Sequence, residues 1–358
     1  MCVSLVLCDP LVVTLTILML QRENSDRFEM LNIFKVLVMI SILYLMYDSL
    51  NHSNSTSNII VRISDPKFKL LGPYSSTEYQ VDDVYNQLID LSNFSFIINP
   101  QPCKGYEAGL LLLIIVASNP NNYGKRSIIR NTWGRSIDST KVVFLLGDSG
   151  NVTLSKLIKK ESNKFGDVVQ GNFIDAYRNM TYKHVMGLKW VAYHCPSAKY
   201  VLKTDDDIVV NSHEFREFLA RELSPWGAKD LIACEVMKHS KAQRSSQSKW
   251  MVSKEEYADE FYPTYCAGWS ILYSQDVIFR LLAVSRTVPY FWIDDVHITG
   301  VMAEKIKVDR SPFASLILTK SRADLLTSRG PKYSGRFLIG PFDLSIDRIS
   351  EIWKAIPQ

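Results

Sequence analysis

The sequence predicts an α/β fold with a mainly parallel, Rossmann-like sheet flanked by helices. Short apolar runs alternate with segments of helical spacing through the middle of the chain, as is typical of a parallel sheet. Residues 110–116 form an unbroken apolar run, which is expected of a strand buried on both faces. Three acids, Asp205, Asp206 and Asp207, follow a later apolar run. They are therefore expected where such sheets bind ligands, beyond the carboxyl ends of the strands.

Each element is predicted from its own pattern. Buried strands are short apolar runs closed by turn residues, such as Gly147 and Asp148 after residues 142–146. Helices carry apolar residues on one face, as Val185 and Leu188 do. These patterns predict strands at 110–116, 142–146, 168–169, 199–203 and 231–236, and helices at 126–133, 154–165, 177–194, 212–222 and 296–305.

The composition is that of an ordinary globular protein. Of 358 residues, 47% are apolar and 22% are charged, and the formal net charge is +4. This charge is small, and the sequence contains no run rich in lysine and arginine. A nucleic-acid partner is therefore not expected.

The N-terminal region predicts a membrane anchor. Residues 31–47 are mostly apolar and are within reach of a membrane span. Arg22 and Arg27 precede this stretch and Asp48 follows it, so the positive-inside rule leaves the N-terminus in the cytosol. An uncleaved signal-anchor is expected. The chain is thus divided into a cytosolic or dispensable leader (1–30), a transmembrane signal-anchor (31–47), a stem (48–102) and a single luminal domain (103–358).

Two further features agree with a luminal location. Beyond the anchor lie four cysteines, Cys103, Cys195, Cys234 and Cys266. They permit two disulfides in an oxidising compartment, with three possible pairings. Five N-x-[S/T] sequons also follow the anchor, at Asn51, Asn54, Asn93, Asn151 and Asn179.

The acid triplet predicts a cation site. Three consecutive carboxylates repel one another, and a hard divalent cation with oxygen ligands offsets that repulsion. Mn²⁺ or Mg²⁺ held by one or two carboxylates generally shares its remaining positions with substrate phosphates. The triplet therefore indicates chemistry on a phosphorylated ligand. The alternative is a solvated acidic turn.

Six sequence blocks carry a resemblance to a known family. They are residues 126–134, 144–147, 175–183, 203–211, 262–268 and 293–300. In this order they resemble the inverting β1,3-glycosyltransferases of the β1,3-galactosyltransferase type. The match covers roughly residues 110–307. It implies a GT-A type fold and a single-pass type II Golgi membrane protein whose catalytic domain is luminal.

The resemblance also implies a reaction. The chain is expected to be a hexosyltransferase that moves galactose, or N-acetylglucosamine, from UDP-galactose or UDP-N-acetylglucosamine to an acceptor sugar hydroxyl. The linkage would be β1,3, formed with inversion, on a glycan carried by lipid or protein. Such a reaction needs a cation to neutralise the leaving diphosphate. It also needs a separate base for the acceptor hydroxyl.

Binding roles follow from the first four blocks. Asp205 and Asp207 match the family's metal-binding acid pair, with Asp207 as the direct ligand; Asp205 and Asp206 would also place the ribose, a water or the donor sugar. Arg126 and Arg130 share a helical face and are assigned to the uridine or diphosphate. The alternative is a surface pair or a salt bridge. Asp175 and Lys183 lie on one helical stripe and are also assigned to cofactor binding, with Lys183 reaching a phosphate.

The last two blocks supply the catalytic and sugar-contacting residues. Asp295 aligns with the family's catalytic base; its alternative role is to cap the helix that follows it. Asp294 stands where the family usually has glutamate, and is assigned to the sugar pocket. A loop lining the donor-sugar and acceptor pocket is expected to contain Tyr262, Tyr265, Gly268 and Trp269, because aromatic faces suit sugar C–H surfaces and glycine permits close approach.

Two other functions are considered. One is a catalytically inactive luminal relative of the same fold that binds sugar or acts as a chaperone. Such a relative would tend to lose Asp207 or Asp295, and both are present. The other is a hydrolase or phosphatase that uses the acid triplet, which leaves the remaining five blocks unexplained.

Overall fold

The computed structural model describes residues 39, 68–73, 80–104, 109–135 and 139–357. The predicted leader, the anchor apart from Met39, and residues 48–67 and 74–79 of the stem lie outside the described residues. Within the described ranges, no helix combines the length and the apolar character that a bilayer crossing requires.

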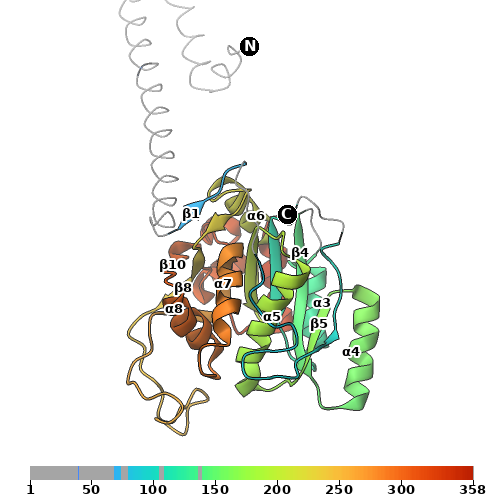
Figure 1. Ribbon diagram of the computed structural model, residues 1–358. Coiled ribbons are helices and arrows are strands. Elements are labelled where there is room, and N and C mark those ends of the chain that lie inside the picture. The colour runs from blue at the N-terminus through green and yellow to red at the C-terminus, as the bar shows by residue number, and fades with distance from the viewer. Residues whose placement is uncertain (1–38, 40–67, 74–79, 105–108, 136–138, 358) are drawn as a thin grey trace, which may run out of the picture. The chain divides into compact units, whose positions relative to one another are not determined.

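An eight-stranded sheet forms the centre of the fold (Figure 1). Its strand order is β10-β8-β9-β6-β3-β4-β5-β2. Neighbours are parallel at β10–β8, β6–β3, β3–β4 and β4–β5, and antiparallel at β8–β9, β9–β6 and β5–β2. The strands are β2 (Phe96–Ile98), β3 (Leu112–Ala117), β4 (Thr140–Asp148), β5 (Val168–Ile174), β6 (Tyr200–Asp205), β8 (Ile232–Met237), β9 (Tyr265–Ser274) and β10 (Arg310–Pro312).

The sheet is mainly parallel, as predicted: β2 and β9 oppose the direction that the other six strands share. The α/β class itself is confirmed. Strand β9 lies between β6 and β8 and runs antiparallel to both. The chain passes from β8 to β9 through residues 238–264, which contain no helix. A parallel return normally needs a crossover helix, so this connection leads to an antiparallel pair.

Helices cover both faces of the sheet, and the residues of β3 show why. Leu113 and Ile115 belong to one core with residues of α5 and α7, whereas Leu112 and Ile114 belong to a second core with residues of α3, α6, α9 and α10. This alternation is the two-residue period of a strand. The helices named here are α3 (Tyr123–Asn131), α5 (Met180–His194), α6 (Ser212–Arg221), α7 (Gln275–Ser285), α9 (Lys320–Arg329) and α10 (Ile346–Ala355).

The other elements are shorter or peripheral. Helix α4 (Val152–Phe165) begins at Asn151, whose side chain accepts a hydrogen bond from Leu154 N over 3.0 Å. A 3₁₀ turn, η1 (Tyr177–Asn179), precedes α5. The segment predicted as a helix at 296–305 starts as a π-helix, η2 (Val296–Met302), and ends as α8 (Ala303–Lys305). The remaining elements are β1 (Lys69–Leu70) paired with β7 (Ala228–Lys229), η3 (Ala314–Leu316) and η4 (Pro331–Tyr333).

Residues 80–104, predicted as the end of the stem, pack against the folded body. Strand β2 extends the sheet beside β5, and Phe94 is buried in the core beneath α5. Asp83 forms an ion pair with the buried Lys189 of α5. Cys103 is disulfide-bonded to Cys195. The second disulfide, Cys234–Cys266, joins β8 to β9, so the pairing that the sequence left open is Cys103–Cys195 and Cys234–Cys266.

Candidate functional site

The acid triplet lies where β6 ends, beside the end of β3. The β3–β6 register pairs Ala117 with Asp205, which brings Ser118 next to the triplet. Asp206 points inward: its Oδ2 accepts hydrogen bonds from Ser118 Oγ over 2.7 Å and from Asn122 Nδ2 over 2.9 Å. Asp207 is more open, with 29% of its side chain exposed. The two acids therefore differ in role, since Asp206 fixes the turn and Asp207 faces outward.

Lys203 connects the triplet to the second pair of acids. Its ammonium lies 3.0 Å from Asp205 Oδ1 and 3.8 Å from Asp294 Oδ2, and it donates to the carbonyl of Gly268 over 2.6 Å. The Lys203 side chain is only 2% exposed, so these contacts compensate a buried charge. The two acidic segments, about 90 residues apart in the sequence, thus belong to one site.

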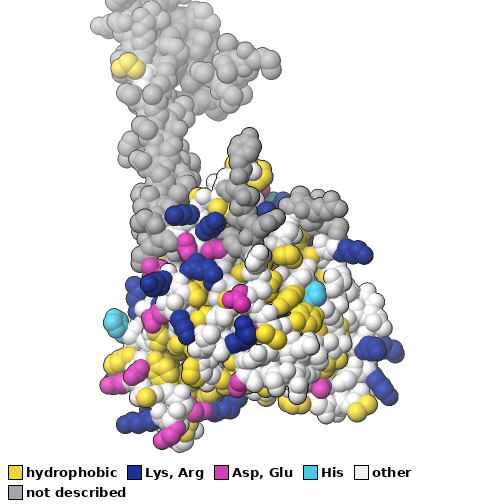
Figure 2. Space-filling view, in the orientation of Figure 1, with side chains coloured by type: hydrophobic (Ala, Val, Ile, Leu, Met, Phe, Trp, Pro, Cys, Tyr) yellow, Lys and Arg dark blue, Asp and Glu magenta, His cyan; other side chains and the backbone are white. Residues whose placement is uncertain are grey.

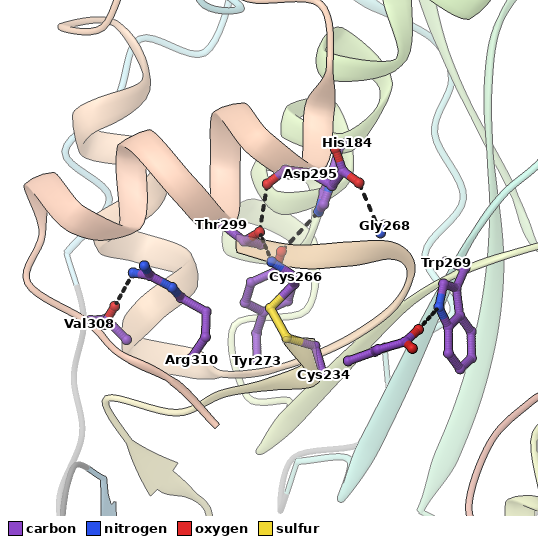
Figure 3. Close-up of a disulfide and its surroundings, with 11 residues drawn as sticks. His184, Cys234, Cys266, Gly268, Trp269, Tyr273, Asp295, Thr299, Val308 and Arg310 are labelled. Atoms are coloured by element: carbon purple, nitrogen blue, oxygen red, sulfur yellow. Dashed lines mark hydrogen bonds between the residues drawn. A yellow bond between two sulfur atoms is a disulfide. The ribbon is translucent and has the colours of Figure 1, made fainter. Parts of the chain in front are cut away.

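Asp294 is held by a second partner on the other side. His184 Nδ1 lies 2.8 Å from Asp294 Oδ2. On the other side of the ring, His184 Nε2 lies 3.2 Å from the hydroxyl of Tyr273 (Figure 3). Burial lowers the pKa of His184, which favours a neutral ring that donates to Asp294 and accepts from Tyr273. Burial opposes ionisation of Asp294, but Lys203 and the hydrogen bond from His184 outweigh it and lower its pKa.

Asp295 is fixed by backbone groups. Its Oδ2 accepts a hydrogen bond from Gly268 N over 3.1 Å (Figure 3). Its Oδ1 accepts one from Val296 N over 2.8 Å. Thr299 Oγ1 donates to the Asp295 carbonyl over 2.6 Å and accepts from Cys266 N over 2.8 Å. Asp295 therefore does begin the helix at 296, and this capping contact leaves it oriented beside β9.

The environment of Asp295 favours the protonated form more than usual. Burial is the main cause, the neighbouring carboxylate of Asp294 adds to it, and together they raise the pKa of Asp295 to about 7. A carboxylate with a pKa near neutrality is suited to general acid–base chemistry. Asp294 and Asp295 thus have opposite shifts in pKa, as expected of acids with different roles.

Arg126 and Arg130, which the prediction assigned to the uridine or diphosphate, are engaged in an internal network of salt bridges. Arg126 is 1% exposed and donates to Glu161, Ser118 and the carbonyls of Asn119 and Pro120. These contacts use all five of its N–H donors. They tie the start of α3 to α4 through the buried carboxylate of Glu161.

Arg130 belongs to the same internal network. Its guanidinium donates to Asp167 and to Glu161, each over 2.7 Å. It also lies over the ring of Phe165, 4.1 Å from the centroid. The salt-bridge alternative therefore describes Arg130 in this structure. Arg126 holds the loop after β3 through Ser118, Asn119 and Pro120, and Arg130 shares its partner Glu161.

Asp175 and Lys183 form an ion pair that links the ends of β3, β4 and β5. Lys183 Nζ lies 2.8 Å from Asp175 Oδ2 and donates to the carbonyl of Ser118, after β3, over 2.7 Å. Asp175 Oδ2 also accepts from Gly147 N, in β4, over 2.6 Å. Lys183 is 3% exposed. The predicted contact of Lys183 with a phosphate remains a prediction, and the visible role of the pair is to position the loop that carries Ser118.

The predicted sugar loop is partly strand. Tyr265, Gly268 and Trp269 lie in β9 rather than in a loop, because hydrogen bonding to β8 and β6 extends the sheet up to Tyr265. Gly268 lies against Asp295, and Trp269 donates to Glu235 Oε2 over 2.8 Å on the other side (Figure 3). Tyr262 is 8% exposed within an aromatic cluster with Tyr257 and Phe291.

Two exposed aromatic side chains that the prediction did not include lie beside the site. Tyr177 is 49% exposed and Trp250 is 48% exposed. Burial of part of Tyr177 raises its pKa, and the carboxylates of Asp294, Asp295 and Asp205 contribute to this rise. Tyr177 is therefore within electrostatic reach of both acidic segments. Tyr177 lies in the sequence block 175–183, whereas Trp250 lies outside all six blocks.

Lys125 was also missed. Its ammonium lies 3.2 Å from Asp206 Oδ1 and 3.4 Å from Asp207 Oδ2. Lys125 directly precedes Arg126, where the first sequence block begins, and so it lies just outside that block. The space-filling view in Figure 2 shows basic and acidic side chains interspersed on the face that it presents.

The carboxylates fit a divalent cation only if the ligand completes the shell. Among the residues that the structure describes, no group of three His, Cys, Asp or Glu side chains is arranged to hold a metal ion. Asp205 and Asp207, 36% and 29% exposed, offer two carboxylates at the surface of the triplet. Mg²⁺ and Mn²⁺ sites commonly use one or two carboxylates together with substrate phosphates, and this pair fits such a site.

Comparisons with known proteins identify a family. The family model described as "Galactosyltransferase" matches residues 124–313. The chain is 32% identical to β1,3-galactosyltransferase 2 of Mus musculus over 227 residues, which are 62% of this chain and 53% of that protein. It is 33% identical to β1,3-galactosyltransferase 5 of Homo sapiens over 202 residues, 55% of this chain and 64% of that protein. The matched region thus spans about half the length of the first relative and under two thirds of the second.

A solved structure also matches, with low structural and sequence similarity. The apo structure of the bifunctional glycosyltransferase WbbM is 13% identical and covers 72% of this chain and 46% of its own, with a TM-score of 0.33.

Proposed function

The chain belongs to the galactosyltransferase family, and from this premise we propose that it is a UDP-dependent β1,3-hexosyltransferase. The donor would be UDP-galactose or UDP-N-acetylglucosamine, and the acceptor would be a sugar hydroxyl of a glycan on lipid or protein. The observation that carries the proposal is the link through Lys203, which brings the acid triplet and the Asp294–Asp295 pair into one site. In this proposal, one bound sugar would lie between a nucleotide site at the triplet and a base at Asp295.

In this mechanism Asp295 is the general base. The acceptor hydroxyl attacks the anomeric carbon from the face opposite the diphosphate, and its proton passes to the Asp295 carboxylate. The new glycosidic C–O bond forms as the bond between the anomeric carbon and the diphosphate oxygen breaks, so the configuration inverts and UDP leaves. The amides of Gly268 and Val296 hold the carboxylate in place for this step.

The neighbouring groups tune and position the base. Asp294 is held in its charged form by Lys203 and His184, and its charge helps to keep the pKa of Asp295 near neutrality. Asp205 and Asp207 would hold Mn²⁺ or Mg²⁺, which when bound neutralises charge on the leaving diphosphate. We assign Asp206 to positioning, since its carboxylate is already engaged by Ser118 and Asn122.

The exposed aromatic side chains are assigned to the acceptor. Tyr177 and Trp250 present half-exposed rings beside the acids, and Lys249 lies over both, 5.9 and 4.6 Å from their centroids. Aromatic faces pack well against the C–H surfaces of sugars. The GT-A type fold is part of the same proposal. The mainly parallel sheet, with a parallel segment from β6 to β5, is compatible with it.

The location is proposed to be the Golgi membrane, as a single-pass type II protein with a luminal catalytic domain. Residues 31–47 would span the membrane, after Arg22 and Arg27 on the cytosolic side. The two disulfides suit an oxidising lumen. Protease protection of tagged full-length protein in sealed microsomes tests this: the C-terminal tag should be protected, and its digestion without detergent would contradict the topology.

A donor screen tests the reaction. Purified full-length protein is incubated with Mn²⁺, a panel of UDP-sugars and β-linked acceptor sugars, and UDP release is measured together with the linkage of the product. We expect release that depends on acceptor and cation, and no cation-dependent UDP binding in Asp207→Ala. The exposed Asp259→Ala serves as the control. Binding of UDP-sugar by the natural chain without transfer to any acceptor would instead indicate an inactive sugar-binding relative.

A further inference from the structure

Lys125 occupies an unusual position for a lysine in a predicted cation site. Its ammonium lies between two acids of the triplet, 3.2 Å from Asp206 Oδ1 and 3.4 Å from Asp207 Oδ2. The other oxygen of Asp206 is already bound by Ser118 and Asn122. Lys125 therefore compensates the free oxygen of Asp206 and the outward oxygen of Asp207 at the same time.

The position conflicts with a divalent cation on Asp207. Mg²⁺ binds carboxylate oxygens at about 2.0–2.1 Å, and the Lys125 ammonium lies 3.4 Å from the same Oδ2. Two cations that share one oxygen repel each other strongly where water is partly excluded. The ammonium therefore opposes binding of a divalent cation at Asp207 Oδ2, and binding there is favoured when the ammonium moves away.

Lys125 is the most exposed of the three lysines that contact the acids discussed here. Lys183 and Lys203 are 3% and 2% exposed and are held by carboxylates and backbone carbonyls. The Lys125 side chain is 26% exposed and extends from the first turn of α3 toward Asp206 and Asp207. A lysine stem is flexible and its ammonium binds phosphate as a point charge. Arg126 has no N–H donor left for that purpose.

We propose that Lys125 competes with the divalent cation for the acid triplet. When the cation binds, the Lys125 ammonium moves away from Asp206 and Asp207 and contacts the diphosphate of the donor. The inference rests on the proposed function, because it assumes a nucleotide diphosphate as the ligand. Its consequence is coupled binding. The cation alone must displace an ammonium, whereas the cation together with a diphosphate gives that ammonium a new partner, so each ligand promotes binding of the other.

Affinity for Mn²⁺ in two conditions tests this proposal. Free Mn²⁺ is measured by electron paramagnetic resonance in titrations of the full-length chain, with and without UDP. In Lys125→Met, Mn²⁺ alone is expected to bind roughly tenfold more tightly, because a positive charge close to the ion has been removed. UDP in the presence of Mn²⁺ is expected to bind more weakly, because the diphosphate has lost a partner.

Two variants serve as controls. Lys125→Arg keeps the positive charge and should retain the natural affinity for Mn²⁺ alone. Lys156→Met removes an exposed lysine from α4 and should change neither affinity. Thermal unfolding of each variant shows whether the protein is folded, and the partly exposed site makes loss of folding in Lys125→Met unexpected.

The outcomes separate this inference from the function on which it rests. Unchanged affinity of Lys125→Met for Mn²⁺ alone, with Mn²⁺-dependent UDP binding still present in the natural chain, would overturn the competition. Weaker binding of Mn²⁺ alone in Lys125→Met would also overturn it. Failure of the natural chain to bind UDP at all would contradict the proposed function itself, and the competition with it.

Discussion

The backbone amide of Gly268 donates a hydrogen bond to Asp295 Oδ2 over 3.1 Å, and the two residues lie so close that a Cβ atom at 268 would crowd the Asp295 side chain. A Cβ atom built on Gly268 would lie 3.2 Å from both Oδ2 and Cβ of Asp295. Gly268 therefore permits the contact between strand β9 and the proposed base. Its role is close approach of the backbone, since no unusual φ is required there.

Gly268→Ala is expected to reduce transfer by roughly 10- to 100-fold, because a small displacement of a catalytic group is costly. UDP binding and the midpoint of thermal unfolding should change little. The rate of product formation and the affinity for UDP are measured in parallel. Gly72→Ala is the matched control, since a Cβ atom there meets nothing within 4 Å. Full transfer activity in Gly268→Ala would show that the position of Asp295 does not depend on this contact.

The pH dependence of transfer follows from the raised pKa of Asp295. A base acts in its deprotonated form, so the rate should fall as the pH drops through about 7 and should level off above it. Asp294→Asn removes a negative charge that raises this pKa. The pKa of Asp295 then moves down toward the usual range, and the acidic limb of the rate profile should shift to lower pH.

The position of the limb, rather than the height of the profile, is the measurement, because Asp294→Asn also alters contacts of Lys203 and His184. The exposed Asp259→Asn should leave the limb in place. A limb that stays where it is in Asp294→Asn would mean that another group titrates.

Loss of the buried carboxylate behind the site should destabilise the fold. Glu161 is 3% exposed and accepts from both Arg126 and Arg130. Glu161→Gln is expected to lower the free energy of unfolding by about 3–5 kcal/mol, because it leaves buried guanidinium groups without their counter-charge. Chemical denaturation measures this quantity.

An exposed pair provides the comparison for that experiment. Glu260 and Lys241 lie 2.8 Å apart, but their side chains are 68% and 64% exposed, so Glu260→Gln should have little effect on unfolding. Equal unfolding midpoints for Glu161→Gln and the natural chain would contradict the structural role assigned to the two arginines.

Patterns within short stretches predicted much of this fold. The apolar run at 110–116 became β3, shifted by two residues at its start, and the acids that follow 199–203 do lie at a strand end. Both predictions depend on burial of a local segment, which apolar residues largely determine. The helices at 154–165 and 212–222 were recovered for the same reason, close to α4 and α6.

Contacts between segments that are distant along the chain could not be predicted from local sequence patterns. The spacing of Arg126 and Arg130 placed them on one helical face, but not on the face toward Glu161 and Asp167, which belong to α4 and the turn after it. The aromatic side chains and Gly268 of β9 form a pattern that is typical of a loop. These residues form a strand because they pair with β6 and β8.

The C-terminal part carried no motif and still contributes to the site. Leu344 N donates to the carbonyl of Asp207 over 2.9 Å, so a segment more than 130 residues away supports the acid turn. His184 likewise has no pattern that predicts it. Its role depends on Asp294 and Tyr273, which lie about 90 to 110 residues further along the chain.

The most direct test of the account is the transfer rate of Asp295→Asn, measured together with its affinity for the UDP-sugar donor. Asparagine preserves the size of the side chain and an oxygen for the amides of Gly268 and Val296, but it is not a base. The account predicts donor binding close to that of the natural chain and a loss of transfer of at least about 100-fold. Transfer at the natural rate in folded Asp295→Asn would show that a different group accepts the proton.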